Sequence, residues 1–571
     1  MPKYFKFIAV IPLLFFCFSC NNTPKQVPDT VDAIYFNGKI LTMEDSLQQV
    51  EAIAVKAGKI EAIGDFETIN QLQGAATQMI DLGGKTMLPG FVDAHSHFTI
   101  AMKMMAQANL GSPPAGEVKS IADIIEKLQA QQAKYNILEG QWIVGWGYDP
   151  DELEEKRHPN KLDLDTAFPN HPVFILHVSA HMAVVNSKAL EIVGITDTTQ
   201  AVEGGVIVKL PNSNEPSGLL QEKMVYQVIG KLPTPTEEQS LALLKGTQQL
   251  YASQGITTAQ DGLTDLPTFQ FLEKAAEKGL FTLDIEALGS FQNAKDWLTT
   301  YKDRFGQNKN RLRLAGIKIV GDGSPQGKTA FFSKPYLTEV PGCAHTCTGV
   351  PTVTQDQLNQ LLQGAYNQGI QVFMHANGDG SIDMLLEAYE NALEHIEGSV
   401  EDLRTVVIHS QFVRPDQLQQ YKDFGFVPAF FTNHAFFWGD VHIENLGEER
   451  AAFLSPIKTS INMGLVCTNH TDYIVTPLNQ LFTVWTAVNR TTRSGKILGE
   501  AERLTPWEAL KAITINSAYQ HKTEKIKGSI AVGKLADFVV LSDNPLKVEA
   551  DKIKDIQILQ TIKEGVVIYE K

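Results

Sequence analysis

The feature that most constrains this fold is the alternation of short apolar runs with helical stretches between residues 86 and 468. Strands that alternate with helices predict a parallel sheet, and eight such units predict an α/β fold of the (β/α)₈ type, the TIM barrel. Helical stretches include 355–368 and 382–397. The predicted strands are 86–93, 256–260, 281–288, 314–320, 370–374, 404–408, 425–431 and 464–468.

The gap between the first two predicted strands, residues 98–255, is far too long for a simple crossover. It contains strand-like runs of its own at 142–148, 172–178 and 204–209. We interpret this gap as an inserted subdomain over the barrel mouth, where barrel enzymes bind substrate.

Short strand-like segments separated by turns occupy both ends of the chain, at residues 31–84 and 523–571. Neither segment is large enough to build a core alone. The most economical arrangement is one β-sandwich domain formed from both termini, with residues 85–522 as a separate barrel domain.

The first 20 residues are typical of a secretion signal. Residues 1–6 are basic, and the apolar run 8–19 is too short to span a bilayer. Because Ser19-Cys20 and a polar stretch follow, the segment resembles a bacterial lipoprotein signal, although Cys17 and Phe18 fit that pattern imperfectly. We expect cleavage to leave Cys20 lipidated, residues 21–30 to act as a tether, and the protein to lie in the bacterial cell envelope, facing the periplasm or the outside. The alternative is an ordinary secretory signal.

The formal net charge of −16 argues against binding to nucleic acid, because no basic face forms easily on such a chain. The partners that we expect are a small-molecule substrate and, through the lipid anchor alone, the membrane. Cys343 and Cys347 could form a small disulfide in an oxidising compartment. The sequence does not define the oligomeric state.

Polar side chains stand at the carboxyl ends of several predicted strands, and in a barrel all of these ends face one mouth. Two histidines one residue apart follow the first strand, a spacing that places both imidazoles on one face. Imidazole is the commonest side-chain ligand for divalent transition metals. A single such histidine would more often form a hydrogen bond in the core, but the whole set predicts a metal centre. Its members are His95, His97, Lys318, His375, His409 and Asp472.

Two residues leave alternatives open: Lys318 within this set and His470 next to it in the sequence. Burial of Lys318 in a strand would lower its pKa, and a neutral amine can react with CO₂ to give a carbamate that bridges two metals. Alternatively, Lys318 extends unmodified to the mouth or contacts the substrate. His470 could face the substrate or support a ligand from behind.

In combination, the motifs make the chain resemble the amidohydrolase-3 branch of the amidohydrolase superfamily, which includes N-substituted formamide deformylases. The resemblance covers nearly all of residues 31–571. Relatives often have a glutamate where this chain has Ile408, and Ser-Asp where it has Thr471-Asp472. The matching motifs are 90–97, 172–207 with His181 and Asn186-Ser187, 255–258, 318–323, 375–379, 471–473 and 533–537.

The resemblance implies metal-dependent hydrolysis of a non-peptide carbon–nitrogen bond. It places one metal at His95, His97 and Asp472 and a second at His375 and His409, with carbamylated Lys318 as the bridge. We expect zinc, and a bound water whose pKa falls to roughly 7.

The same resemblance implies that Asp472 acts as the general base. It also implies that the second metal or His181 polarises the carbonyl. Two other functions remain possible on the sequence: a mononuclear hydrolase or deaminase with unmodified Lys318, and a non-catalytic lipoprotein that binds a ligand at the cell surface. The binding protein would have lost metal ligands.

Overall fold

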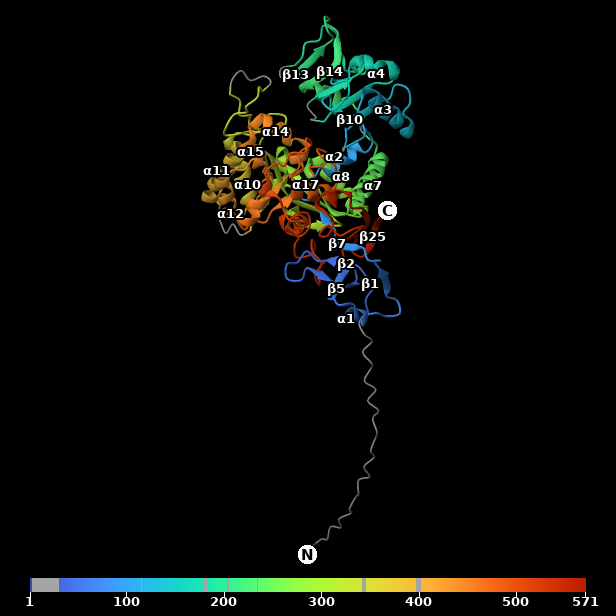
Figure 1. Ribbon diagram of the computed structural model, residues 1–571, viewed down its shortest axis with the longest axis vertical. Coiled ribbons are helices and arrows are strands. Elements are labelled where there is room, and N and C mark those ends of the chain that lie inside the picture. Colours follow the sequence, from blue (N-terminus) through green and yellow to red (C-terminus); the bar gives the residue numbers. More distant parts are fainter. Residues whose placement is uncertain are drawn as a thin grey trace.

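The computed structural model describes residues 1–2, 30–113, 115–178, 182–202, 205–233, 235–340, 346–396 and 402–571. Most of the predicted signal and tether lies outside these residues, and so do His181 and Cys343. Cys347 is described and takes part in a disulfide. Within the described part, no helix combines the length and apolar character needed to cross a membrane. In Figure 1 the inserted sheet, the barrel and the sheets of the termini follow one another along the long axis.

The barrel sheet has the strand order β22-β21-β20-β19-β18-β16-β15-β8, and all of these neighbours are parallel. The predicted (β/α)₈ fold class is thereby confirmed. The strands are β8 (Phe91–Val92), β15 (Ile256–Thr264), β16 (Asp284–Ser290), β18 (Leu312–Val320), β19 (Val372–Ala376), β20 (Val406–His409), β21 (Val427–Phe430) and β22 (Thr468–Asn469), with β17 (Asn308–Lys309) paired antiparallel to β18.

The barrel closes between its first and last strands at the mouth. The backbone N–H of His97 donates to the carbonyl of Tyr473 at 2.8 Å, and that of Asp472 donates to the carbonyl of His95 at 3.1 Å. Below them, the side-chain amide of Gln520 forms hydrogen bonds to residues of both strands. The seam is therefore fixed at the end that carries the candidate ligands.

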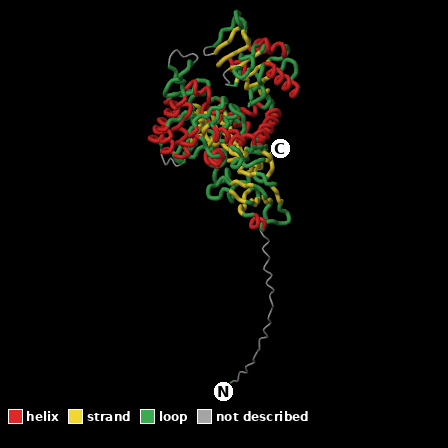
Figure 2. Tube along the Cα trace, in the orientation of Figure 1, coloured by secondary structure: helices red, strands yellow, loops and turns green. Residues whose placement is uncertain are grey.

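Helices surround the strands (Figure 2). The helix α10 shows why these segments fold so: Leu358, Leu362 and Ala365 form its buried face, and Thr354 caps its first turn. The helices of this layer are α2 (Phe98–Met104), α7 (Glu237–Ser253), α8 (Leu266–Glu277), α9 (Ala294–Thr299), α10 (Gln355–Tyr366), α11 (Asp379–His395), α12 (Pro415–Phe424), α13 (Asn433–Phe437), α14 (Gly439–Leu446), α15 (Glu448–Ala452), α16 (Ile457–Asn462), α17 (Gln480–Asn489), α18 (Pro506–Ala512) and α19 (Ile515–Gln520).

The two termini form the predicted β-sandwich. One sheet has the order β5-β4-β1-β6 and the other β25-β24-β23-β7-β2-β3. Tyr35 and Ile53 from the first sheet pack in one core with Phe538 and Ile562 from the second. The strands are β1 (Ala33–Phe36), β2 (Lys39–Leu41), β3 (Gln49–Val50), β4 (Ala52–Lys56), β5 (Lys59–Gly64), β6 (Gln78–Asp81), β7 (Thr86–Pro89), β23 (Phe538–Leu541), β24 (Ile558–Lys563) and β25 (Val566–Glu570), and α1 (Phe66–Asn70) packs on β4 and β5.

The single strand predicted at 86–93 is wrong, because the chain changes sheets at Gly90. Before it, β7 pairs with β2 and β23 in the sandwich; after it, β8 pairs with β15 in the barrel. A Cβ at Gly90 would lie 2.3 Å from Thr257, so only glycine fits this close approach. The predicted strand 464–468 is also mostly wrong, since only Thr468–Asn469 pairs. An apolar run shows burial but not the sheet that buries it.

The insertion after the first barrel strand is confirmed. Its sheet has the order β13-β14-β12-β11-β10-β9, and two apolar cores separate from that of the barrel lie on it. At the ends of the insertion, α2 and α7 pack on the barrel strand β15. The elements of the inserted sheet are β9 (Ala108–Asn109), α3 (Ile121–Tyr135), β10 (Ile143–Tyr148), α4 (Lys161–Ala167), β11 (Val173–His177), β12 (Met182–Val185), α5 (Ser187–Val193), β13 (Gly205–Lys209), β14 (Pro216–Glu222) and α6 (Lys223–Ile229).

Candidate metal centre

Three histidines converge on one carboxylate at the mouth of the barrel. Nε2 of His95 and Nε2 of His97 lie 3.4 and 3.3 Å from Oδ1 of Asp472. Nε2 of His409 lies 3.9 Å from the other carboxylate oxygen. His95, His409 and Asp472 are buried, and each offers one ligand atom within 4.8 Å of the others. This spacing is short enough for metal coordination.

The other two predicted ligands lie beside this group. Nζ of Lys318 is 3.3 Å from Nε2 of His95, and the ring of His375 is centred 4.5 Å from the ring of His409. All six residues predicted as metal ligands are therefore brought together. His181 lies outside the described residues.

Two of these residues adopt unusual backbone conformations. His409 has φ 72° and Asp472 has φ 48°, both in the left-handed region, and Ser410 follows with φ 44°. Such conformations cost of order 1–3 kcal/mol for residues other than glycine, and they persist where the surrounding structure imposes them. The side chains of His409 and Asp472 thus reach the mouth from backbone conformations that lower the stability of the fold.

Gln260 fixes the orientation of His95. Its Nε2 donates to the carbonyl of Ala94 at 2.7 Å, so the atom that faces Nδ1 of His95 at 2.6 Å is its oxygen, an acceptor. His95 therefore carries its hydrogen on Nδ1 and presents the lone pair of Nε2 to the mouth. Nothing in the sequence marks Gln260 for this role, because a lone glutamine within a strand carries no motif.

His470 lies inside the centre, between two of the candidate ligands. It is fully buried, and neither ring nitrogen has a partner among the described residues. Its ring is centred 5.2 Å from that of His95 and 5.1 Å from that of His409. Burial lowers the pKa of His470 to about 3, against the opposing effect of Asp472, so the ring is neutral at pH 7. A neutral imidazole can donate one hydrogen bond and accept another.

The electrostatics leave these groups in their metal-binding forms. Burial, followed by neighbouring cationic groups, lowers the pKa of His95 and His409 well below the usual value. Burial acts to raise the pKa of Asp472, but His97, His470 and Lys318 outweigh it and lower the pKa overall. Burial also lowers the pKa of Lys318 to about 7. Neutral imidazoles and an anionic carboxylate are the states that bind metal.

The residues therefore fit a divalent metal ion. Oδ1 of Asp472 is buried and has no hydrogen-bond partner among the described residues, although two imidazole nitrogens lie within 3.4 Å of it. An orphaned carboxylate oxygen surrounded by imidazole nitrogens lacks the cation that would satisfy it. Nitrogen and carboxylate donors of this kind suit zinc and related metals.

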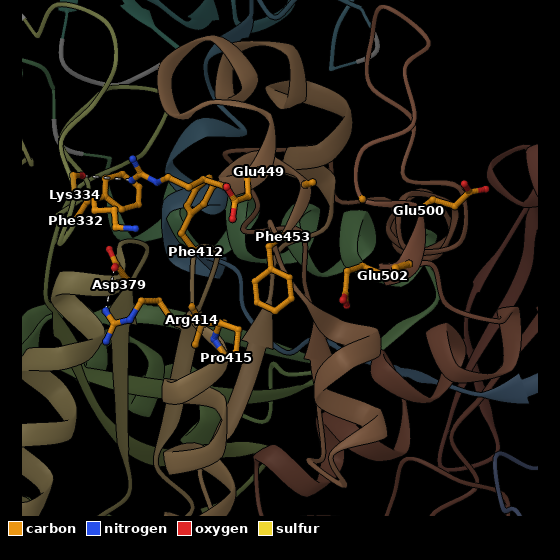
Figure 3. Close-up of a pocket in the computed structure, with 15 residues that line it drawn as sticks. Phe332, Lys334, Asp379, Phe412, Arg414, Pro415, Glu449, Phe453, Glu500 and Glu502 are labelled. Atoms are coloured by element: carbon orange, nitrogen blue, oxygen red, sulfur yellow. Dashed lines mark hydrogen bonds and ion pairs between the residues drawn. The ribbon is translucent and has the colours of Figure 1, made fainter.

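A cavity of about 550 Å³ lies between residues 332–334, 379, 412–415, 449–453 and 499–502 (Figure 3). Aromatic side chains such as Phe412 and Phe453 line it, and Arg414 is paired with Asp379 on one wall at 3.0 Å. None of the six candidate ligands lines this cavity. We therefore do not assign it to the reaction.

Comparison with known proteins gives consistent results. A family model described as "Amidohydrolase family" matches residues 78–569. N-substituted formamide deformylase of Arthrobacter pascens is 27% identical over 553 residues, which cover 95% of this chain and 98% of that protein. Protein LONG AFTER FAR-RED 3 of Arabidopsis thaliana is 29% identical over 580 residues, covering 98% and 96%. An uncharacterized metal-dependent hydrolase from Pyrococcus furiosus has a similar fold, with a TM-score of 0.72 and 24% identity over 90% of this chain and 100% of that one.

Proposed function

Since the chain belongs to the amidohydrolase family and is a hydrolase of carbon–nitrogen bonds, we propose that it cleaves a small amide of the N-substituted formamide type. The observation that carries this proposal is the convergence of His95, His97 and His409 on the carboxylate of Asp472. The deformylase relative, which matches almost end to end, supports the choice of substrate class.

In this proposal the six residues hold two divalent metal ions, with zinc as the expected metal. His95, His97 and Asp472 hold one ion, and His375 and His409 hold the other. Lys318 would supply further oxygen ligands as a carbamate, which forms when its neutral nitrogen adds to the carbon of CO₂ and loses a proton. The low pKa of Lys318, about 7, supports this reaction because a large fraction of the amine is neutral at pH 7.

A bound divalent metal supplies a water molecule whose pKa is lowered to roughly 7. A carboxylate oxygen of Asp472 would accept the proton of the attacking water and return it to the leaving nitrogen. The neutral ring of His470 can donate a hydrogen bond to the substrate. From the insert, we propose that His181 polarises the substrate carbonyl, an assignment supported by the family resemblance alone.

The test is metal content together with turnover. We expect about two metal equivalents per chain in protein purified without chelator or a polyhistidine tag, and release of amine and formate from N-substituted formamides. One equivalent would instead support a mononuclear enzyme with unmodified Lys318. No metal, even after addition of zinc and bicarbonate, would contradict a hydrolase and favour a ligand-binding protein.

We also propose that the protein is a lipoprotein of the bacterial cell envelope, anchored through Cys20 and facing the periplasm or the outside. The basic start, the apolar run 8–19 and Ser19-Cys20 support this proposal. Cells fed labelled palmitate should label the wild-type protein but not the Cys20→Ser variant. Equal labelling, or none in either protein, would contradict the anchor.

A further inference from the structure

The candidate ligand His375 is held by a carboxylate that no step above uses. Asp322 follows β18 and its side chain is fully buried. Its Oδ1 lies 3.1 Å from Nδ1 of His375 and accepts a hydrogen bond from the backbone N–H of Asn377 at 3.0 Å. Its Oδ2 accepts the backbone N–H groups of Gly378 at 2.8 Å and Phe331 at 3.0 Å.

These contacts decide which nitrogen of His375 carries the hydrogen. Three backbone N–H groups point at the carboxylate, so both oxygens of Asp322 act as acceptors. The hydrogen between Asp322 and His375 therefore lies on Nδ1 of the imidazole. Nε2 then carries the lone pair that can bind a metal, although Nδ2 of Asn377 lies 3.4 Å from it.

The partner of His375 differs from that of His95. His95 is oriented by the neutral amide of Gln260, whereas His375 is oriented by a carboxylate. A carboxylate behind a histidine fixes its orientation and makes the opposite nitrogen a stronger metal ligand. The same carboxylate also ties the end of β19 to the loop that carries Phe331.

We propose that Asp322 is a positioning residue that holds His375 ready for the second metal ion, and that its loss empties this position alone. The inference rests on the proposed binuclear centre. It assigns a different strength to the two halves of that centre, because His375 is oriented by a buried carboxylate whereas His95 is oriented by a neutral amide.

The decisive variant is Asp322→Asn in the full chain. Asparagine keeps the size of the side chain, but its NH₂ group must face either two backbone N–H groups or the side of His375. The second arrangement places a donor against Nδ1, moves the imidazole hydrogen to Nε2 and prevents metal binding there. We expect metal content to fall from about two equivalents to about one, with affinity for the second ion reduced roughly 10-fold to 100-fold.

Asp379→Asn is the matched control. Asp379 is the first residue of α11 and accepts the backbone N–H of Ser333 at 2.9 Å. It thus ties the loop that carries Phe331 to this helix, and it contacts no candidate ligand among the described residues. Zinc titration against a chelator of known affinity, circular dichroism and the melting temperature should be measured for both variants. The control should melt earlier but keep about two equivalents.

The outcomes separate this inference from the proposed function. Two tightly bound ions in Asp322→Asn, or equal loss of metal from both variants, would overturn the positioning role while leaving the hydrolase intact. A wild-type chain with fewer than two equivalents would overturn the inference together with the binuclear centre. Turnover that falls in Asp322→Asn and recovers with added zinc would agree with the weakened second position.

Discussion

The barrel buries charged residues at both of its ends, and the two ends differ in whether these residues have partners. The floor is the end where the strands begin, and the mouth is the end where they finish. At the floor, Asp284 is paired with Lys527 and with Lys563, the latter at 2.8 Å, and Lys563 also pairs with Asp537 at 2.8 Å. Each of these charges has a partner of opposite sign. At the mouth, Oδ1 of Asp472 and both nitrogens of His470 have no hydrogen-bond partner among the described residues.

The two buried lysines show the consequence of this difference. Burial acts to lower the pKa of Lys563, but Asp537 and Asp284 outweigh it and raise the pKa above its usual value. Burial dominates for Lys318, whose pKa falls to about 7 despite the charge of Asp472. The fully paired network joins the barrel to the sandwich and has a structural role. The unsatisfied polar groups at the mouth indicate a site that binds a ligand.

The largest effect expected is loss of turnover in Asp472→Asn. The variant removes the proton acceptor, so kcat for an N-substituted formamide should fall roughly 10²-fold to 10⁴-fold. The melting temperature should stay close to that of the wild type, since the amide is nearly isosteric. Full activity in this variant would show that another group accepts the proton.

Lys563→Ala tests the floor. Removing one partner from a buried ion-pair network leaves uncompensated charge, so the free energy of unfolding should fall by about 3–5 kcal/mol. Urea unfolding followed by circular dichroism measures this change. Lys552→Ala is the control, because Lys552 is 70% exposed and its pair with Asp555 at 3.6 Å should contribute little. Equal effects of the two variants would refute the contrast between buried and exposed pairs.

Lys318→Met should raise the free energy of unfolding, whereas Lys563→Ala should lower it. In metal-free protein, charged Lys318 destabilises the fold, so the methionine variant should be more stable at pH 7 by roughly 2–4 kcal/mol. The comparison requires chelator and CO₂-free buffer. A variant less stable than wild type would show that Lys318 is paired more strongly than its environment indicates.

The stability gained by Lys318→Met depends on pH, because Lys318 loses its proton at a different pH in the folded and the unfolded chain. Folded Lys318 loses its proton near pH 7, while the unfolded chain keeps it to about pH 10.5. The unfolded state thus binds more protons across this window, and wild-type stability rises with pH there. The advantage of Lys318→Met should be complete below pH 7 and shrink toward pH 10.5.

The smallest effect is expected at the exposed ion pair between the insert and the barrel. Nη1 of Arg493 lies 2.7 Å from Oε1 of Glu152, and the side chains are 31% and 42% exposed. Glu152→Gln should change the free energy of unfolding by about 0.2–1 kcal/mol, and less at high salt. A larger change that persists at 1 M salt would show that this pair is part of a broader contact between the two parts.

The sequence alone determined the features that depend on local pattern. Alternating apolar runs predicted the barrel, the two β-rich ends predicted one sandwich, and polar residues at strand ends predicted the six residues of the mouth. These predictions succeed because strand periodicity and the common direction of parallel strands place such residues on one edge.

Only the tertiary structure decided which partners meet across long separations. In the folded chain Thr86–Pro89 belongs to the sandwich, and Lys563 pairs with Asp284. Gln260 contacts His95, and Asp322 contacts His375. No local pattern encodes these pairs, because each depends on the approach of distant segments and on the removal of water around them. That loss of water strengthens the ion pairs at the floor and leaves the unpaired groups of the mouth available to bind metal.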